Sequence, residues 1–94
     1  MLSACGDSTK ICFSFDDNSY SVNDTIYADA TCSENVSDYD WTPGEGMQMI
    51  GNGYGATEAF LITELNGTLS RTVNLSVSND NSSRSQSKSV IVIP

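Results

Sequence analysis

Few side chains in this 94-residue sequence could do catalytic chemistry, and carboxylates are the main ones. No histidine occurs, so neither a Ser-His-Asp triad nor a Cys-His pair can form. The paired carboxylates are Asp16 with Asp17, Asp38 with Asp40, and Glu58 with Glu64. Asp38 and Asp40 alternate along one expected strand, on a face that we expect to be solvated. Because no base stands beside a nucleophile, we predict no catalytic residue and no enzymatic activity.

Calcium is the one ion for which the sequence offers ligands, since Ca²⁺ prefers carboxylate and amide oxygens. Asp16 and Asp17 belong to one polar segment, and Asp80 belongs to another. If the two segments were adjacent loops, their carboxylates would form a weak calcium site. The alternative, which we favour, is a pair of Asx-rich turns that cap their own backbone. We expect no other cofactor.

Cys12 and Cys32 flank two expected strands. An antiparallel pairing centred near Val22 would place them opposite each other, and closing a loop of roughly 20 residues would stabilise the fold by about 3 kcal/mol. A metal site is not expected, because no third cysteine has a suitable spacing and histidine is absent. We favour a disulfide bond, with two separate buried thiols as the alternative.

The third cysteine lies in Leu2-Ser3-Ala4-Cys5-Gly6, which resembles a bacterial lipobox. The resemblance implies that Cys5 is lipidated in the native protein and that Met1 is an artificial start inside a signal peptide. Residues 1–9 would then be a residual lipobox and a flexible tether. We expect an exported lipoprotein of the outer membrane or cell surface, with the periplasmic face as an alternative. A chance match at a flexible terminus is the other interpretation.

The segment Asp24-Thr25-Ile26 resembles the O-glycosylation acceptor of Bacteroidetes. Together with the lipobox, it implies a lipoprotein of Bacteroidetes type.

The charge of the chain is strongly negative, at −8. The four basic residues are spread along the sequence: Lys10, Arg71, Arg84 and Lys88. Since no basic patch could neutralise phosphates, we predict no nucleic-acid binding. Anionic membranes would repel the chain, so we expect membrane contact only through the lipid anchor. The partner is expected to be an unidentified protein or glycan, and the isolated domain a monomer.

Alternating apolar residues and turn signals predict an all-β protein. Helix-favouring residues are scarce, which agrees with this prediction. The expected strands are 11–15, 25–31, 38–42, 47–50, 56–65, 69–78 and 89–93, with a turn at 16–20 and a polar loop at 79–87. About seven strands of this spacing are typical of an immunoglobulin-like β-sandwich with two antiparallel sheets. We assign it to residues 10–94 as a single domain.

Residues 39–46 carry Trp41, Gly44 and Gly46 in the spacing W-x-x-G-x-G. The stretch resembles the Y-x-W-x-F-G-D-G segment of the PKD family of immunoglobulin-like domains. The family's later run of apolar residues ending in Asn is matched by Val73, Leu75, Val77 and Asn79. Arg71 stands where the family has a tyrosine. The resemblance implies an extracellular spacer, adhesion or accessory binding module.

We therefore predict a non-catalytic interaction or spacer module of a cell-surface lipoprotein. The alternatives are a carbohydrate-binding accessory module and a Ca²⁺-stabilised adhesin domain. A carbohydrate site needs exposed aromatic rings, for which the candidates are Tyr54, Tyr20 and Tyr27. Tyr54, in the glycine-rich segment 51–55, is the first choice among them.

Overall fold

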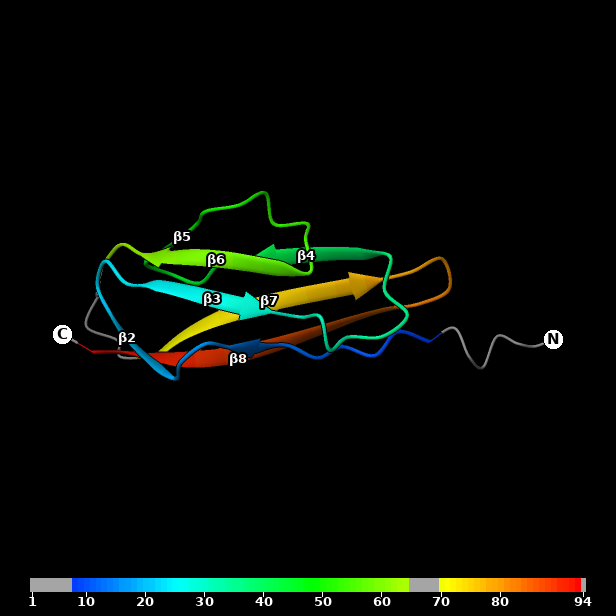
Figure 1. The fold of residues 1–94 in the computed structure, drawn as a ribbon, viewed down its shortest axis with the longest axis horizontal. Helices are drawn as coiled ribbons and strands as arrows, with labels where there is room; N and C mark the ends of the chain where they lie inside the picture. The colour runs from blue at the N-terminus through cyan, green and yellow to red at the C-terminus, as the bar shows by residue number, and fades with distance from the viewer. Residues whose placement is uncertain (1–7, 65–69, 94) are drawn as a thin grey trace.

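The computed structural model describes residues 8–64 and 70–93, which form two four-stranded sheets (Figure 1). The first sheet has the order β1-β3-β6-β5, with β1 at Ser14–Phe15, β3 at Thr25–Asp29, β6 at Thr57–Ile62 and β5 at Met47–Met49. The second has the order β2-β8-β7-β4, with β2 at Ser19–Ser21, β8 at Ser83–Ile93, β7 at Ser70–Ser78 and β4 at Asp38–Thr42. Within these two ranges, no helix is long and apolar enough to cross a membrane.

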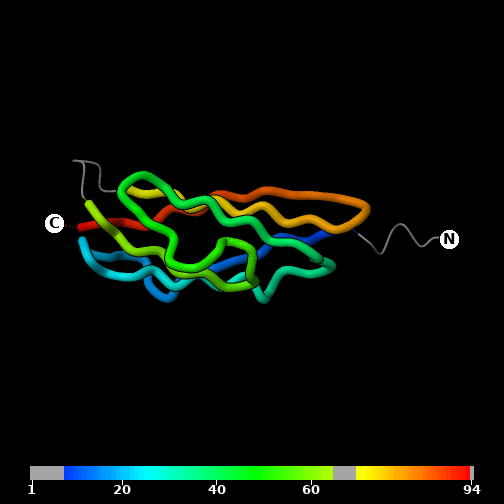
Figure 2. Tube along the Cα trace, turned by 90° about the horizontal axis from the view of Figure 1, so that it is seen from above, coloured from blue at the N-terminus to red at the C-terminus, as the bar shows by residue number. Residues whose placement is uncertain are grey.

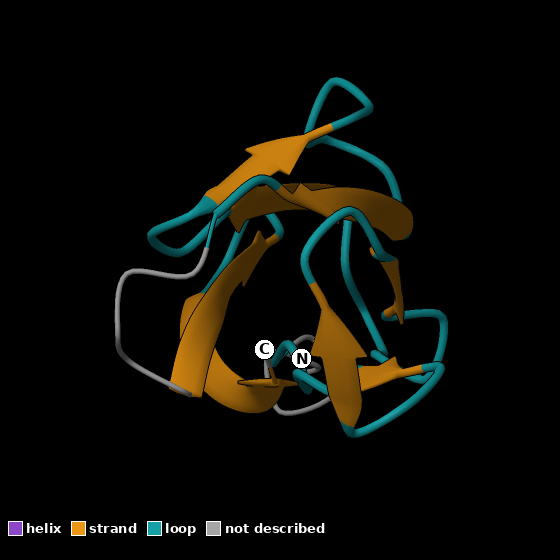
Figure 3. Ribbon diagram, turned by 90° about the vertical axis from the view of Figure 1, so that its left-hand side faces the viewer, coloured by secondary structure: helices purple, strands orange, loops and turns teal. Residues whose placement is uncertain are grey.

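The two sheets face each other (Figure 3), and the core lies between them, where alternate residues of strands such as β6 and β7 are buried. Trp41 on β4 is only 2% exposed, and its ring meets Phe13 and Phe60 edge-on at centroid distances of 5.3 and 6.0 Å. Each buried aromatic ring contributes about 2–3 kcal/mol relative to an exposed one. The predicted all-β sandwich is confirmed.

The strand order identifies the sandwich as immunoglobulin-like. In that fold, strands A, B, E and D form one sheet, and strands C, F and G lie in the other. Here β1-β3-β6-β5 follows the order A-B-E-D, and β4-β7-β8 follows C-F-G. The first strand is split, because the chain leaves β1, crosses to the other sheet and continues as β2 beside β8.

Two parts of the second sheet differ from the sequence-based prediction. Residues 19–21 were expected in a turn, but they form β2, which pairs with residues 91–93 of β8 in parallel. The sheets are therefore not wholly antiparallel. Residues 83–87 were expected in a loop, but they extend β8 along β7 (Figure 2). Their serine side chains bond across to β7, as in the contact of Ser85 with Ser76 at 2.9 Å, so this half of the strand shows no apolar alternation.

The packed part of the domain includes Thr9, one residue before the expected boundary. Thr9 is 1% exposed, and its N–H donates to Oγ of Ser82 at 2.9 Å. Its carbonyl accepts a hydrogen bond from Nε of Arg84 at 3.0 Å. Residues 1–7, with the proposed lipidation site Cys5, lie outside the described residues.

Candidate functional site

A disulfide joins Cys12 and Cys32, whose Cα atoms are 5.4 Å apart. The antiparallel pairing of β1 with β3 matches Ser14 with Asp29 and thereby brings the two cysteines together. The bond ties the segment before β1 to the turn after β3. It differs from the usual immunoglobulin disulfide, which links the B and F strands of opposite sheets.

Tyr20 is not available as a surface binding residue, which corrects the expectation from sequence. Its ring is buried, because the parallel pairing of β2 with β8 turns it into the core beside Val92. Its hydroxyl donates to Oδ1 of Asp16 at 2.7 Å and accepts the N–H of Asp17 at 2.8 Å. Burial and the hydrogen bond to Asp16 raise the pKa of the Tyr20 hydroxyl above its ordinary value.

The same contact changes the acidity of Asp16. Burial acts to raise the pKa of its carboxyl group. Hydrogen bonds from the Tyr20 hydroxyl and from the backbone N–H of Tyr27 outweigh burial and hold the pKa below the ordinary value of 3.8. Asp16 is thus ionised at neutral pH and is fixed against both β2 and β3.

The three carboxylates expected to bind calcium do not come together. Asn18, next to Asp17, accepts a hydrogen bond from the N–H of Ile91, whereas Asp80 lies in the turn before Ser83. Eight residues of β8 separate these points, which corresponds to about 27 Å along a strand. The described residues contain no group of three potential metal-binding side chains. The proposed site at Asp16, Asp17 and Asp80 is therefore not formed.

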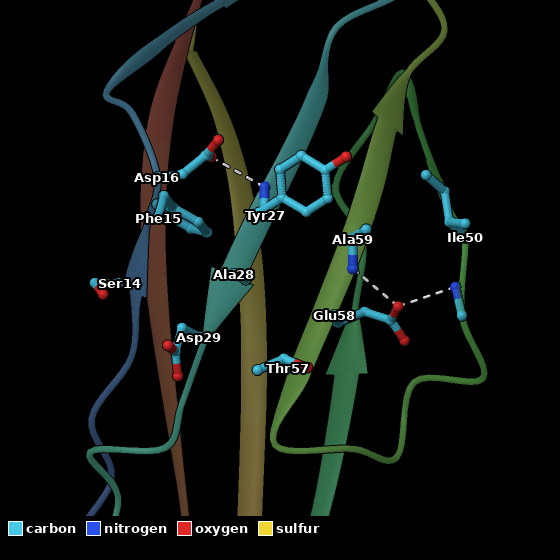
Figure 4. A pocket seen from close by; sticks show the side chains of 11 residues that line it. Ser14, Phe15, Asp16, Tyr27, Ala28, Asp29, Ile50, Thr57, Glu58 and Ala59 are labelled. Atoms are coloured by element: carbon cyan, nitrogen blue, oxygen red, sulfur yellow. Dashed lines mark hydrogen bonds between the residues drawn. The ribbon is translucent and has the colours of Figure 1, made fainter.

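An open groove of about 610 Å³ lies on the outer face of the β1-β3-β6-β5 sheet (Figure 4). Tyr27 of β3 and Ile50, which follows β5, are 59% and 58% exposed. Figure 4 shows them on either side of Ala59, whose small side chain leaves the groove open. This exposed apolar surface lies on the face of the sheet that points away from the core.

Glu58 fixes the wall of the groove. Its nearly buried carboxylate accepts three backbone N–H groups: Oε1 from Gly51 and Ala59, both at 2.9 Å, and Oε2 from Gly53 at 2.6 Å. The sequence analysis paired Glu58 with Glu64 and missed this role. The sequence feature that could have revealed this role of Glu58 is the glycine-rich segment 51–55, because its backbone N–H groups need acceptors.

Trp41 holds the other side of the same segment. Its backbone N–H donates to the carbonyl of Gly53 at 2.9 Å, and its indole Nε1–H donates to the carbonyl of Gly55 at 2.8 Å. The segment after β5 is therefore fixed to both sheets, by Glu58 on β6 and by Trp41 on β4. The position of Ile50 in the groove wall follows from these contacts.

The groove is negatively charged. Its lining residues include Asp16, Asp29 and Glu58, and none of the lining residues is basic. The hydroxyl and the backbone N–H of Thr31 both donate to Oδ1 of Asp29, and they lower the pKa of its carboxyl group. Asp16 and Asp29 therefore carry full charges at neutral pH in the lining of the groove that also contains Tyr27.

The two exposed tyrosines lie in different places. Tyr27 lines the groove. Tyr54 is 68% exposed in the segment after β5, where its N–H is held by Oδ1 of Asn52 at 2.9 Å. It is not among the residues that line the groove. Of the three candidate tyrosines, only Tyr27 thus combines an exposed ring with a concave, charged setting.

No family model and no curated protein matches the chain. A solved structure described as "Chimeric titin Z1Z2 functionalized with a KLER exogenous peptide from decorin" is 14% identical to it. The match covers 90% of this chain and 96% of that one, with a TM-score of 0.46. The assignment of an immunoglobulin-like fold rests on the strand order of this chain.

Proposed function

We propose that this chain is a non-catalytic spacer and interaction module of a protein exported to a bacterial cell surface. The observation that carries the spacer role is that the described chain enters and leaves at opposite ends (Figure 1). Thr9 lies beside Ser82 at the β7–β8 turn, and Ile93 ends β8 ten residues beyond Ser83. Ten strand residues span about 34 Å, so in a protein with several domains in series this domain would separate its two neighbours by nearly its full length.

Export is supported by two features. The Cys12–Cys32 disulfide suits an oxidising compartment outside the cytoplasm. The lipobox-like segment around Cys5 would supply a lipid anchor on the N-terminal side, and it would be the only contact with the membrane. The domain would then stand next to the outer membrane or cell surface as the first rigid element after the anchor.

Membership of the PKD-like group is part of the same proposal. Gly44 approaches β7 so closely that an added Cβ would lie 2.3 Å from the Thr72 carbonyl oxygen, and Gly46 has a φ of 69°. Both positions of the W-x-x-G-x-G turn therefore favour glycine over residues with a side chain, which supports the resemblance to the PKD family.

The spacer role is tested by joining two copies of residues 8–94 in tandem and measuring small-angle X-ray scattering. The maximum dimension should grow by about 34 Å or more over the single domain. A tandem protein whose two copies fold back on each other, with little increase in the maximum dimension, would contradict the proposal.

The anchor is tested in a bacterial host that expresses the full native gene, by membrane fractionation and protease treatment of intact cells. The protein should be in the membrane fraction, and a Cys5→Ser variant should be released from it. Equal membrane association of both proteins would contradict lipidation at Cys5.

Glycan binding is a second candidate function, because the rings of Tyr27 and Tyr54 are more than half exposed. A glycan array would test it, with Tyr54→Ala and Tyr27→Ala as the variants. Loss of binding in either variant, with an unchanged melting temperature, is the expected result. Binding that survives both substitutions would contradict it.

A further inference from the structure

We propose that the groove between Tyr27 and Ile50 binds a short cationic segment of a partner protein, with an Arg or Lys side chain lying on the Tyr27 ring. The inference rests on the proposed function, because it names the kind of partner that the interaction module takes. It places the cationic group between the carboxylates of Asp16 and Asp29.

The strand register brings these two carboxylates to one side of Tyr27. Asp16 and Tyr27 are opposite each other, since the N–H of Asp16 donates to the Tyr27 carbonyl at 3.0 Å. Asp29 lies opposite Ser14, two residues further along the same pair of strands. Two residues correspond to about 7 Å along the strands, and neighbouring strands lie about 5 Å apart, so the diagonal between the two Cα atoms is about 8–9 Å. The planar guanidinium group of an arginine between them could donate to one carboxylate from each side.

Each carboxylate has an oxygen available for a ligand. Oδ1 of Asp16 accepts the hydroxyl of Tyr20 and the N–H of Tyr27, and Oδ1 of Asp29 accepts both donors of Thr31. Among the described residues, no hydrogen bond is made to Oδ2 of either group. The internal contacts orient the two carboxylates without using up their capacity to accept.

The apolar part of the groove suits the stem of a long basic side chain. Tyr27 and Ile50 expose more than half of their surface, and Ala59 lies between them. Arginine and lysine bury their methylene groups against such surfaces and place the charge over or beside an aromatic ring. The groove therefore offers one surface to the stem and another to the charge.

Charge favours a cationic peptide over a neutral glycan. The groove has three acidic lining residues and no basic one, within a chain of net charge −8. Such a field attracts a positively charged segment and speeds its association. A neutral sugar would use the same ring, but it would gain nothing from the accumulated charge.

The test uses the peptide Gly-Leu-Arg-Leu-Arg-Gly-amide with carboxyfluorescein on its N-terminal amine, and a control in which citrulline replaces both arginines. Binding is followed by fluorescence anisotropy, and its place by ¹⁵N chemical shifts of the whole chain. The arginine peptide should bind about tenfold more tightly and shift amides around Tyr27, Asp29 and Thr57. Binding should weaken as salt screens the charges.

Matched variants separate the groove from the overall charge. Tyr27→Ala should weaken binding about tenfold, and Asp29→Asn about threefold to fivefold. Asp40→Asn removes the same charge from the outer face of the other sheet and should leave binding unchanged. All three residues are exposed, and equal melting temperatures will show that the fold is intact.

Several results would overturn the inference: no binding, equal binding of the citrulline peptide, or equal weakening by Asp40→Asn and Asp29→Asn. A neutral oligosaccharide that shifts the same amides, when the peptide does not, would assign the groove to glycans instead. None of these results would affect the spacer role, which the scattering measurement on the tandem protein tests separately.

Discussion

The hydroxyl of Tyr20 donates a 2.7 Å hydrogen bond to Oδ1 of Asp16, and the same oxygen accepts the N–H of Tyr27 at 3.0 Å. Tyr20 belongs to β2 in one sheet and Tyr27 to β3 in the other. One carboxylate thus holds the chain where it crosses from the first sheet to the second. The two hydrogen bonds also orient the side chain of Asp16 at the rim of the groove.

This contact predicts a specific dependence of stability on pH. The folded state lowers the pKa of Asp16 below 3.8, so its carboxylate stabilises the fold above that pH. The contribution is lost as the pH falls from 3.8 through the lower pKa of the folded state. Asp16→Asn should reduce the free energy of unfolding by about 1 kcal/mol at neutral pH. The difference between wild type and variant should shrink in acid.

Urea denaturation at a series of pH values from 7 to about 2.5 measures this difference. Asp40→Asn serves as the control for loss of one negative charge. A gap between wild type and Asp16→Asn that stays constant over the whole series would contradict the assigned role of Asp16.

The disulfide predicts a large effect of reduction. Cys12 and Cys32 are separated by 20 residues, and opening a loop of that length should lower the free energy of unfolding by about 2–4 kcal/mol. Thermal unfolding of a Cys5→Ser protein with and without reductant measures the loss, because no third thiol then interferes. Intact mass after alkylation without reductant should show no modified cysteine. Two modified cysteines would show that the bond does not form in solution.

The parts of the fold with apolar alternation could be predicted from the sequence. Val73, Leu75 and Val77 mark β7 as a half-buried strand, and the single tryptophan lies at the centre of the core as an immunoglobulin-like pattern requires. The pairing centre expected near Val22 also agrees with the observed match of Ser14 to Asp29. Local pattern and tertiary packing agree in these strands.

Two strands lacked such a pattern. In the first half of β8, cross-strand hydroxyl contacts such as Ser76 with Ser85 at 2.9 Å accompany the backbone ladder, and a run of serines in a sequence is typical of a loop. β2 is only three residues long and contains one inward residue, Tyr20, so alternation could not reveal it. Its position depends on the parallel pairing with β8, which is a tertiary contact.

The groove could not be predicted for a related reason. Its lining comes from β1, β3, β6 and the segment after β5, which are distant in sequence. Tyr27 was identified as a candidate by residue type alone. The role of Glu58 depends on where the backbone donors of 51–55 lie, and that is fixed only when the sheets have packed.

The hydrogen bonds of the Glu58 carboxylate predict a further effect on stability. Glu58→Gln replaces one acceptor oxygen with an NH₂ group, which must face a backbone N–H of Gly51 or Gly53. Leaving one such donor unsatisfied costs about 1–3 kcal/mol. Amide hydrogen exchange at Gly51 and Gly53 should accelerate, and the fluorescence of Trp41 should change, since it bonds to the same segment. Glu45→Gln, at an exposed position, is the control and should do neither. Equal exchange rates in both variants would show that Glu58 does not hold the segment.

The turn after β4 predicts unequal effects of adding a methyl group to different glycines. A Cβ at Gly44 would lie 2.3 Å from the backbone oxygen of Thr72, and one at Gly46 would lie 2.6 Å from that of Glu64 at a φ of 69°. Neither backbone oxygen can rotate away, so the turn itself must shift. Gly44→Ala and Gly46→Ala should each lower the free energy of unfolding by about 1–3 kcal/mol.

Gly55→Ala is the matched control for these two variants. A Cβ there would lie 3.3 Å from the nearest atom, the Thr57 oxygen, and Gly55 has no positive φ. Chemical denaturation of the three variants gives the comparison. If Gly55→Ala were as destabilising as the other two, general loss of backbone freedom would explain the results. If only Gly44→Ala and Gly46→Ala are affected, the W-x-x-G-x-G spacing is required because the turn packs directly against β7 and the segment that follows β6.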